Sequence, residues 1–488
     1  MIADASVQPG AVVIRGAAAA ALGLAAGAVA TGAADPVLAV AGLAGLATAV
    51  AVVLRPAVGL PVIAVFAVLR LADVATDFHG APSTFTPLVA LLLAAVVIRW
   101  LTTAERPAGA GRVVLVAGPF VLVAVGSLLW AGDPTTSTSA AEALVKDGAV
   151  AVIVGLLLHR PRDLRATVWA IVLAGGAVAT VTSAQFLLGA FDTTVFGFAQ
   201  SEVQNIVGAT DDVRISGPIG DPNYYAQFLV MIVPLAYERW RTAAPGPLRL
   251  AAAWATVATG ASTVFTFSRG GALAIAVVAV IVLVRFRPSR SMIVAAVVGT
   301  VALLPLLPPG YVERLTTLDQ VGTIEASTDA SIRGRTSVLR AGTAMFLDAP
   351  LRGVGYGGFQ DAYVDYARGF GIEVSADPRE AHNLYLEIAA ETGMAGLAAF
   401  GVLVAGVAAA LRTARRSFRA AGRDDLEGIA YALGASLLGY LLTSIFLHMA
   451  FARFAWLLAG VALALPAVAA GVHADSGPAT SSREAAWM

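Results

Sequence analysis

Apolar runs of about 20 residues recur along almost the whole chain, and they constrain its fold more than any other feature of the sequence. A helix of that length spans a bilayer, and it satisfies its own backbone hydrogen bonds there. Only 13% of the 488 residues are charged, against about 25% in soluble domains, which is too few to cover a large water-soluble fold. This excludes a cytosolic enzyme, a nucleic-acid-binding protein and a disordered scaffold. We predict an all-α polytopic membrane protein, with the lipid bilayer as its partner and no nucleic acid.

Breaks at proline, glycine and charge divide these runs into about 14 (12–14) candidate transmembrane helices. They are 12–32, 36–54, 57–72, 85–101, 112–131, 140–158, 165–190, 222–240, 248–268, 270–286, 291–308, 384–411, 427–449 and 453–472. We interpret the first as a retained helix and not a signal peptide, because Asp4 and Arg15 lie at its start and another span follows at once.

The spans predict an organisation in six parts. These are N-terminal transmembrane helices (1–190), an extracytoplasmic loop (191–221), central transmembrane helices (222–308), a large, partly helical extracytoplasmic loop (309–383), C-terminal transmembrane helices (384–472) and a cytoplasmic tail (473–488).

Arginine is distributed unevenly between alternate loops. With the N-terminus placed in the cytoplasm, the short outer segments 33–35, 73–84 and 132–139 contain no arginine, whereas the inner loops are rich in it. This positive-inside pattern predicts a multi-pass protein of the plasma membrane with both termini in the cytoplasm. Two outer segments break the rule, because 191–221 contains Arg214 and 309–383 contains several arginines. An anionic ligand at the outer face would explain them, and ion pairs within the same loops are the alternative.

Two short segments at this outer face place arginine beside a predicted helix start. Asp221 is a good N-cap and Pro222 suits the first helical position, so Arg214 could fold back over a helix N-terminus that favours anions. The alternative is a capped helix with a solvated arginine. Arg269 joins two apolar runs with almost no loop. It either reaches to the membrane interface or faces the bundle interior and binds phosphate.

Two further segments lie in and after the large loop. The first contains Arg333 and Arg335, followed by a glycine run through Gly353, Gly355 and Gly358. That run matches a dinucleotide-binding pattern in form, but no strand precedes it, so we reject that function. The second segment begins with His382, which opens a span directly after the loop and could act as a general base near neutral pH. A lone histidine is more often structural, but here arginine-bearing segments share its membrane face.

Taken in this order, the segments resemble the O-antigen ligase/polymerase family. The resemblance covers about 214–397, and it rests on Arg214 with Gly217 and Asp221-Pro222-Asn223, Ser268-Arg269-Gly270, Gly334-Arg335 with Pro350, Gly353, Gly355 and Gly357, and His382-Asn383 with Glu391-Thr392-Gly393. Two features depart from the family pattern. Leu339 stands where a tryptophan is common, and fourteen spans exceed the twelve expected for ligases.

The resemblance implies a membrane glycosyltransferase of the GT-C type that works on the extracytoplasmic side, in polysaccharide biosynthesis for the cell envelope. It implies transfer of a glycan from an undecaprenyl-diphosphate carrier to a hydroxyl of a glycan, lipid or protein acceptor, without metal or other cofactor. The residues it assigns are the essential histidine His382, the paired arginines Arg214 and Arg335, and the substrate-binding candidates Arg269, Arg333, Asn223 and Asn383.

The chemistry of the residues agrees with that assignment. Guanidinium groups can stabilise the charge of a diphosphate leaving group, and a neutral histidine can take the proton of an acceptor hydroxyl. A ligase and a repeat-unit polymerase need the same site, so the sequence leaves both open. A transporter or flippase for lipid-linked glycans would also explain arginines in a cavity, and a structural membrane subunit is the remaining alternative.

Overall fold

The computed structural model describes residues 36–103, 109–205, 211–287, 290, 294, 330–369, 379–448 and 452–475. The expected span 12–32, most of the expected span 291–308 and most of the tail 473–488 lie outside these residues. The described chain is mainly helical, as the apolar runs predict.

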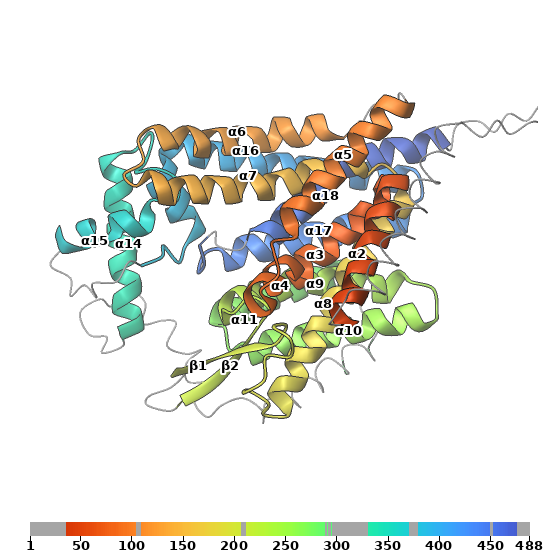
Figure 1. Ribbon diagram of the computed structural model, residues 1–488, viewed down its shortest axis with the longest axis horizontal. Coiled ribbons are helices and arrows are strands. Elements are labelled where there is room, and N and C mark those ends of the chain that lie inside the picture. The colour runs from red at the N-terminus through yellow and green to blue at the C-terminus, as the bar shows by residue number, and fades with distance from the viewer. Residues whose placement is uncertain are drawn as a thin grey trace, which may run out of the picture.

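Long helices make up the body of the molecule (Figure 1). They are α2 (Pro36–Leu54), α3 (Gly59–Leu69), α4 (Leu71–His79), α5 (Phe85–Thr103), α6 (Ala110–Gly126), α7 (Pro134–Leu157), α8 (Pro161–Leu187), α9 (Pro222–Thr242), α10 (Pro247–Phe265), α11 (Arg269–Phe286), α14 (Ala330–Asp348), α15 (Phe359–Gly369), α16 (Leu384–Ala420), α17 (Asp424–Thr443) and α18 (Arg453–Asp475). Two short 3-10 helices, η1 (Pro56–Val58) and η2 (Ser127–Leu129), precede α3 and follow α6.

Six helices in the described residues are long and apolar enough to cross a membrane, and a seventh is added if α3 and α4 count as one bent span. The chain is thus a polytopic membrane protein. The described residues do not reach the expected count of fourteen spans. The expected span 57–72 is broken at Arg70, whose φ of 49° turns the backbone left-handed between α3 and α4. The expected span 427–449 is also too long, because α17 ends at Thr443.

The helices pack in two groups. Figure 1 shows α6, α7 and α16 running along one side of the molecule and α8 to α11 along the other, with α17 and α18 between them. Small residues allow close packing, as at Gly176 of α8, where an added Cβ would lie 2.7 Å from the Cβ of Ala255 on α10. The helix α14 stands at one end of the bundle, near the end at which the hairpin lies.

A small antiparallel hairpin departs from the all-α prediction. Strands β1 (Gln200–Asn205) and β2 (Asp211–Gly217) pair within the segment 191–221, which the sequence indicated only as a polar loop. In this register Val203 faces Val213 and Glu202 faces Arg214. The strands are short and mostly polar, so they lack the apolar alternation by which a buried strand is recognised.

Helix α16 is interrupted at Gly393, whose φ of 63° and ψ of −159° are not helical. The interruption frees backbone groups that pair with the glycine-rich loop 350–355. Four hydrogen bonds do this: Val354 N–H to Ala390 O (2.9 Å), Gly355 N–H to Glu391 O (2.9 Å), Met394 N–H to Pro350 O (2.8 Å) and Ala395 N–H to Leu351 O (3.4 Å). A Cβ at position 393 would lie 2.4 Å from the carbonyl carbon of Leu351, so only glycine fits this close approach. The loop thereby holds the first turns of α16 in place.

Candidate active site

Arg214 is held against the N-terminus of α9, where the sequence placed it. The Asp221 carboxylate caps this helix by accepting hydrogen bonds from the backbone N–H groups of Asn223 (2.7 Å) and Tyr224 (3.0 Å). The Arg214 side chain is only 6% exposed. Its Nε donates to the Thr266 carbonyl (2.8 Å) and its Nη2 donates to Asn223 Oδ1 (3.0 Å). The arginine is therefore folded back and buried, and the alternative of a solvated arginine is wrong.

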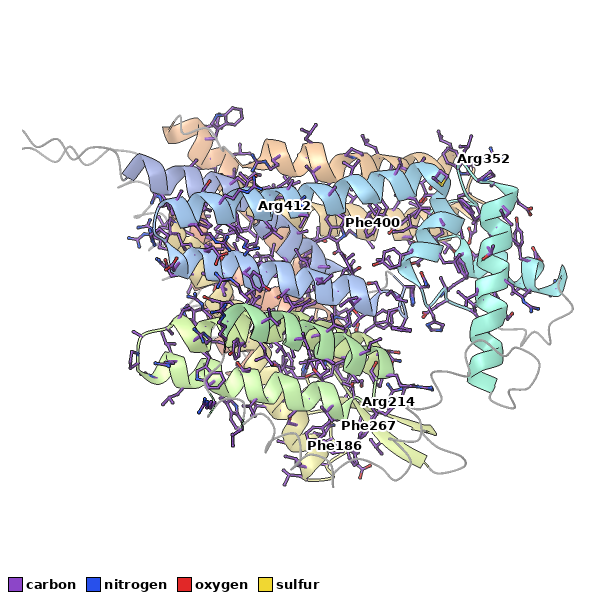
Figure 2. All side chains as sticks on the ribbon, turned by 180° about the vertical axis from the view of Figure 1, so that it is seen from behind. Phe186, Arg214, Phe267, Arg352, Phe400 and Arg412 are labelled. Atoms are coloured by element: carbon purple, nitrogen blue, oxygen red, sulfur yellow. The ribbon has the colours of Figure 1, made fainter. Side chains whose placement is uncertain are left out.

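The hydrogen bond from Arg214 to Thr266 brings the segment that contains Arg269 to the N-terminus of α9. Thr266 belongs to the turn between α10 and α11, and Ser268 caps α11 by accepting a hydrogen bond from the Gly271 N–H (3.2 Å). Arg269 is the first residue of α11 and is partly buried. Figure 2 shows Arg214 and Phe267 together at the hairpin end of α9 to α11. Two helix N-termini and two arginines thus gather at one end of the bundle.

His382 lies just before the start of α16. Its φ of 44° is in the left-handed region, which is uncommon for a residue other than glycine and is found mostly where the surroundings fix the backbone. The surroundings here are tight, because Asn383 Oδ1 accepts the Leu386 N–H (3.0 Å) and the Leu384 N–H donates to the Ser444 carbonyl (2.9 Å). Asn383 is thus a helix cap. The His382 side chain is exposed and so is accessible to a substrate.

His448 lies beside His382, with the two ring centroids 6.0 Å apart. Its side chain is only 10% exposed, and its Nδ1 is 3.1 Å from Glu380 Oε2. The Tyr224 hydroxyl also forms a hydrogen bond with Nδ1. Nδ1 has a hydrogen-bond partner in both neutral tautomers of the ring. When Nδ1 carries the proton, it donates to the Glu380 carboxylate, and when it does not, it accepts from the Tyr224 hydroxyl. Segments from α9, from the end of the large loop and from the turn after α17 therefore meet at one cluster.

Burial sets the charge states in this cluster. Burial, together with a smaller effect of the neighbouring His382, lowers the pKa of His448 to about 3. Burial also raises the pKa of the Glu380 carboxyl, and the nearby Asp221 adds to that rise. His448 is consequently neutral at physiological pH, so its contact with Glu380 is a hydrogen bond and not an ion pair.

Among the described residues, Glu380, His382 and His448 could together hold a metal ion. Each offers one ligand atom, and these atoms lie within 4.8 Å of one another. Two imidazoles and one carboxylate are a donor set that suits zinc and other transition metals. The same three side chains suit proton transfer without a metal, because a histidine and a carboxyl group are the usual general acids and bases.

Two cavities adjoin the cluster. One of about 270 Å³ lies between α7, the 356–360 turn and the start of α16, and the other of about 180 Å³ lies toward α9. Both are lined by Asp147. The first cavity is lined by carboxylates and aromatic rings, namely Asp147, Glu380, Glu387, Glu391, Tyr356 and Phe359, together with His448. Carboxylates accept hydrogen bonds from hydroxyl groups, so this lining suits a ligand rich in hydroxyls.

Not every predicted site residue is placed by the structure. Arg214, Asn223 and Arg269 lie together at the helix N-termini, and His382 and Asn383 lie at the start of α16. Arg333 and Arg335 fall within the backbone of α14, but their side chains lie outside the described residues. Their assignment stays a prediction.

The sequence did not identify His448, Glu380 or Tyr224 as members of the site. His448 was expected near the end of a span, and only the early end of α17 at Thr443 brings it into the turn that faces His382. Glu380 and Tyr224 flank the predicted motifs at two and three residues from His382 and Asp221. Their closeness in sequence to the candidate base His382 and to the helix cap Asp221 was the signal from which Glu380 and Tyr224 could have been predicted.

Comparison with known proteins gives one family match. Residues 254–401 match the family model described as O-antigen ligase. The matched region runs from α10 through α11 and α14 to α16, so it includes Arg269 and His382 but begins after Arg214. No curated protein matches the chain.

Proposed function

The chain carries a domain of the O-antigen ligase family, and from this premise we propose that it transfers a glycan from an undecaprenyl-diphosphate carrier to an acceptor hydroxyl. The family supports a membrane glycosyltransferase of the ligase or polymerase type. The proposal adds that the reaction takes place on the outer face of the plasma membrane and proceeds without a metal. The observation that carries it is the gathering of two arginine-bearing helix N-termini and a histidine cluster at one end of the bundle.

The arginines stabilise the leaving group in this mechanism. When the glycosidic C–O bond breaks, the diphosphate takes the bonding electron pair and gains negative charge. Arg214 and Arg269, with Arg335 and Arg333 as further candidates, provide guanidinium groups suited to bidentate contact with phosphate. The N-terminus of α11, which is capped by the neutral Ser268, adds partial positive charge near the same place. Charge fixed in advance of the reaction is the largest single contribution in many enzymes.

The histidine cluster handles the proton of the acceptor. Neutral His382 takes the proton of the acceptor hydroxyl as its oxygen attacks the anomeric carbon. His448 stays neutral and buried beside it, so it orients the site without competing for that proton. Attack in line with the departing diphosphate inverts the anomeric centre. We place sugar residues of the substrate in the cavity of about 270 Å³ that is lined by carboxylates and His448.

A polymerase of the same superfamily is the alternative within this enzyme class. It needs the same diphosphate site and differs only in its acceptor, which is then a second carrier-linked glycan. A lipid-linked glycan transporter or flippase is the alternative from another class. It would use arginines in a cavity but has no need of a histidine base.

The test is an in vitro transfer reaction with the full chain in detergent. The purified protein is incubated with a polyprenyl-diphosphate glycan, a panel of acceptors and EDTA, and both free polyprenyl diphosphate and the glycan product are measured. The proposal expects carrier release that resists EDTA and depends on His382 and Arg335. Product size then separates stepwise polymer growth from a single transfer. Loss of release in EDTA would point to a metal held by Glu380, His382 and His448. Specific carrier binding without release on the whole panel would favour transport.

A further inference from the structure

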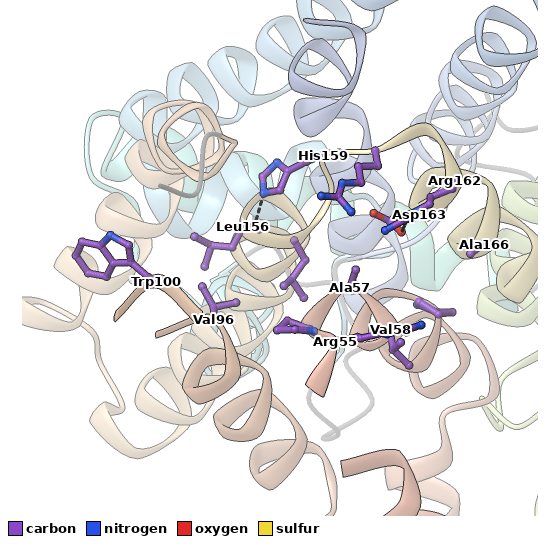
Figure 3. A pocket seen from close by; sticks show the side chains of 14 residues that line it. Arg55, Ala57, Val58, Val96, Trp100, Leu156, His159, Arg162, Asp163 and Ala166 are labelled. Atoms are coloured by element: carbon purple, nitrogen blue, oxygen red, sulfur yellow. Dashed lines mark hydrogen bonds and ion pairs between the residues drawn. The ribbon is translucent and has the colours of Figure 1, made fainter. Parts of the chain in front are cut away.

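A second large cavity lies at the end of the bundle opposite His382. It has a volume of about 960 Å³ and lies between η1, α3, α5 and the turn from α7 to α8 (Figure 3). Helix α7 shows the separation, because its first turns contact the 355–357 loop near the candidate active site, whereas Leu156 and Leu157 at its far end line this cavity. The cavity therefore belongs to no part of the proposed reaction.

The rim of this cavity is cationic. Arg55, Arg160 and Arg162 line it, and Asp163 is the only acidic residue among the lining residues that the structure describes. Asp163 faces Arg162 at 3.6 Å, but Arg162 is 71% exposed, so this ion pair is weak. Arg55 and Arg160 make no side-chain hydrogen bond or ion pair with any residue that the structure describes. Two positive charges thus remain without an acidic partner in the described part of the chain.

Several other arginines at this end of the bundle are paired. Arg165 forms a salt bridge with Asp425, and Glu427 accepts hydrogen bonds from Arg285, Arg415 and Arg419. Arginines in inner loops are expected from the positive-inside rule alone. That rule does not explain why Arg55 and Arg160, from loops about a hundred residues apart in sequence, converge on one cavity with no acidic partner among the described residues.

The walls of the cavity are apolar. Val96, Leu156, Leu157 and Pro61 line it, and Trp100 stands near the end of α5 with 52% of its surface exposed. Tryptophan is enriched at the depth of lipid headgroups in membrane proteins. Helix α8 begins at this cavity after Arg160 with no side chain capping its first turn, so the positive end of the helix dipole lies at the cavity. A cationic rim above an apolar wall matches a ligand with an anionic phosphate and acyl chains.

We propose that this cavity binds an anionic glycerophospholipid, with its phosphate between Arg55, Arg160 and Arg162 and its acyl chains along α5 and α7. Basic pockets between transmembrane helices hold such headgroups in other membrane proteins. The volume of about 960 Å³ is within the range of sites for small ligands. The inference does not rest on the proposed transferase activity, because the cavity and the candidate active site share no residue.

Lipid binding to the purified chain tests this inference. Native mass spectrometry is used to titrate the detergent-solubilised protein with phosphatidylglycerol, with phosphatidylcholine and with inorganic phosphate. The triple variant Arg55→Ala, Arg160→Ala, Arg162→Ala is compared with a control of equal charge change, Arg287→Ala, Arg412→Ala, Arg416→Ala, whose residues are exposed and do not line the cavity. Because each arginine near an anionic lipid contributes roughly a factor of five, the loss of three should weaken phosphatidylglycerol binding about a hundredfold. The control should bind as the wild type does, and phosphatidylcholine should bind weakly to all three.

Three outcomes would overturn the inference. The cavity variant and the wild type could bind phosphatidylglycerol equally, or the control could lose as much affinity as the cavity variant, which would mean that binding follows net charge alone. Inorganic phosphate could also displace phosphatidylglycerol efficiently, which would identify a free phosphate compound as the ligand. If the triple variant does not fold, the double variant Arg55→Gln, Arg160→Gln is used with Arg287→Gln, Arg412→Gln as its control, and the same comparison decides.

Discussion

Glu380 and Glu427 differ both in how deeply their side chains are buried and in which groups contact their carboxylates. Glu427 is 1% exposed, and its carboxylate accepts hydrogen bonds from Arg415 (2.8 Å), Arg419 (2.7 Å) and Arg285. Glu380 is 40% exposed and its carboxylate contacts neutral His448 at 3.1 Å, with His382 beyond it. One glutamate is surrounded by guanidinium groups and the other lies among imidazole rings.

This difference indicates that the two ends of the bundle have different roles, one in stability and the other in the proposed reaction. Three guanidinium groups stabilise the ionised carboxylate of Glu427, which thereby links α11, α16 and α17. Burial raises the pKa of Glu380 and lowers that of His448, and perturbed titratable groups in a cavity are a mark of functional sites. Variants at the two ends should therefore separate activity from stability.

The largest effect is expected for His382→Ala. Removing the general base should lower the transfer rate by about 10²–10⁴-fold, because proton removal from the acceptor contributes that much. The fold should survive, since His382 is exposed. The measurement is the rate of polyprenyl diphosphate release, with His79→Ala as a control at an exposed histidine far from the cluster in sequence. Near-normal turnover by His382→Ala would remove the base assignment.

Arg214→Ala should lower the same rate by roughly 10²–10³-fold, because it removes one fixed donor from the diphosphate site. Arg214→Lys should recover only part of this loss, because an ammonium group lacks the planar set of donors with which the guanidinium group hydrogen-bonds to both Thr266 and Asn223. Arg340→Ala, at an exposed position of α14, is the matched control and should leave the rate unchanged. Equal loss in Arg214→Ala and Arg340→Ala would show that only overall charge matters.

Glu427→Gln should act on stability and not on the transfer rate of the folded protein. It leaves three arginines without their shared carboxylate, which should lower the free energy of unfolding by about 1–3 kcal/mol, less than for a fully buried pair because the guanidinium groups are partly exposed. The measurements are the unfolding temperature in detergent and the rate per folded molecule. A rate loss comparable to that of His382→Ala would contradict the division between the two ends.

A separate effect is expected in the pH dependence of stability. Because the pKa of His448 is about 3 in the folded protein and near 6.5 when unfolded, the unfolded chain binds the extra proton between these values. The stability from neutral His448 is therefore complete above about pH 6.5 and is lost as the pH falls toward 3. Glu380, whose pKa is raised, acts in the opposite direction and reduces the net slope. The unfolding temperature of His448→Asn should fall less on acidification than that of the wild type, and parallel curves would count against this account.

The sequence predicted the local parts of this structure better than the contacts between them. Asp221 as a helix cap and Arg214 folded over it follow from residues within ten positions of one another, and both are confirmed. The meeting of His448 with His382 depends on where α17 ends and on how α16 packs beside it, which no local pattern records. The break at Gly393 could not be predicted either, because it is stabilised by a loop about forty residues away.

The anomeric configuration of the product tests the central claim most directly. A single displacement in which His382 removes the acceptor proton and the arginines hold the leaving diphosphate must invert the anomeric centre. The linkage formed by the wild-type protein from a carrier-linked glycan of known configuration can be determined by nuclear magnetic resonance. The account predicts a configuration opposite to that of the donor. Retention would require a covalent glycosyl-enzyme intermediate and would contradict direct attack by an acceptor activated at His382.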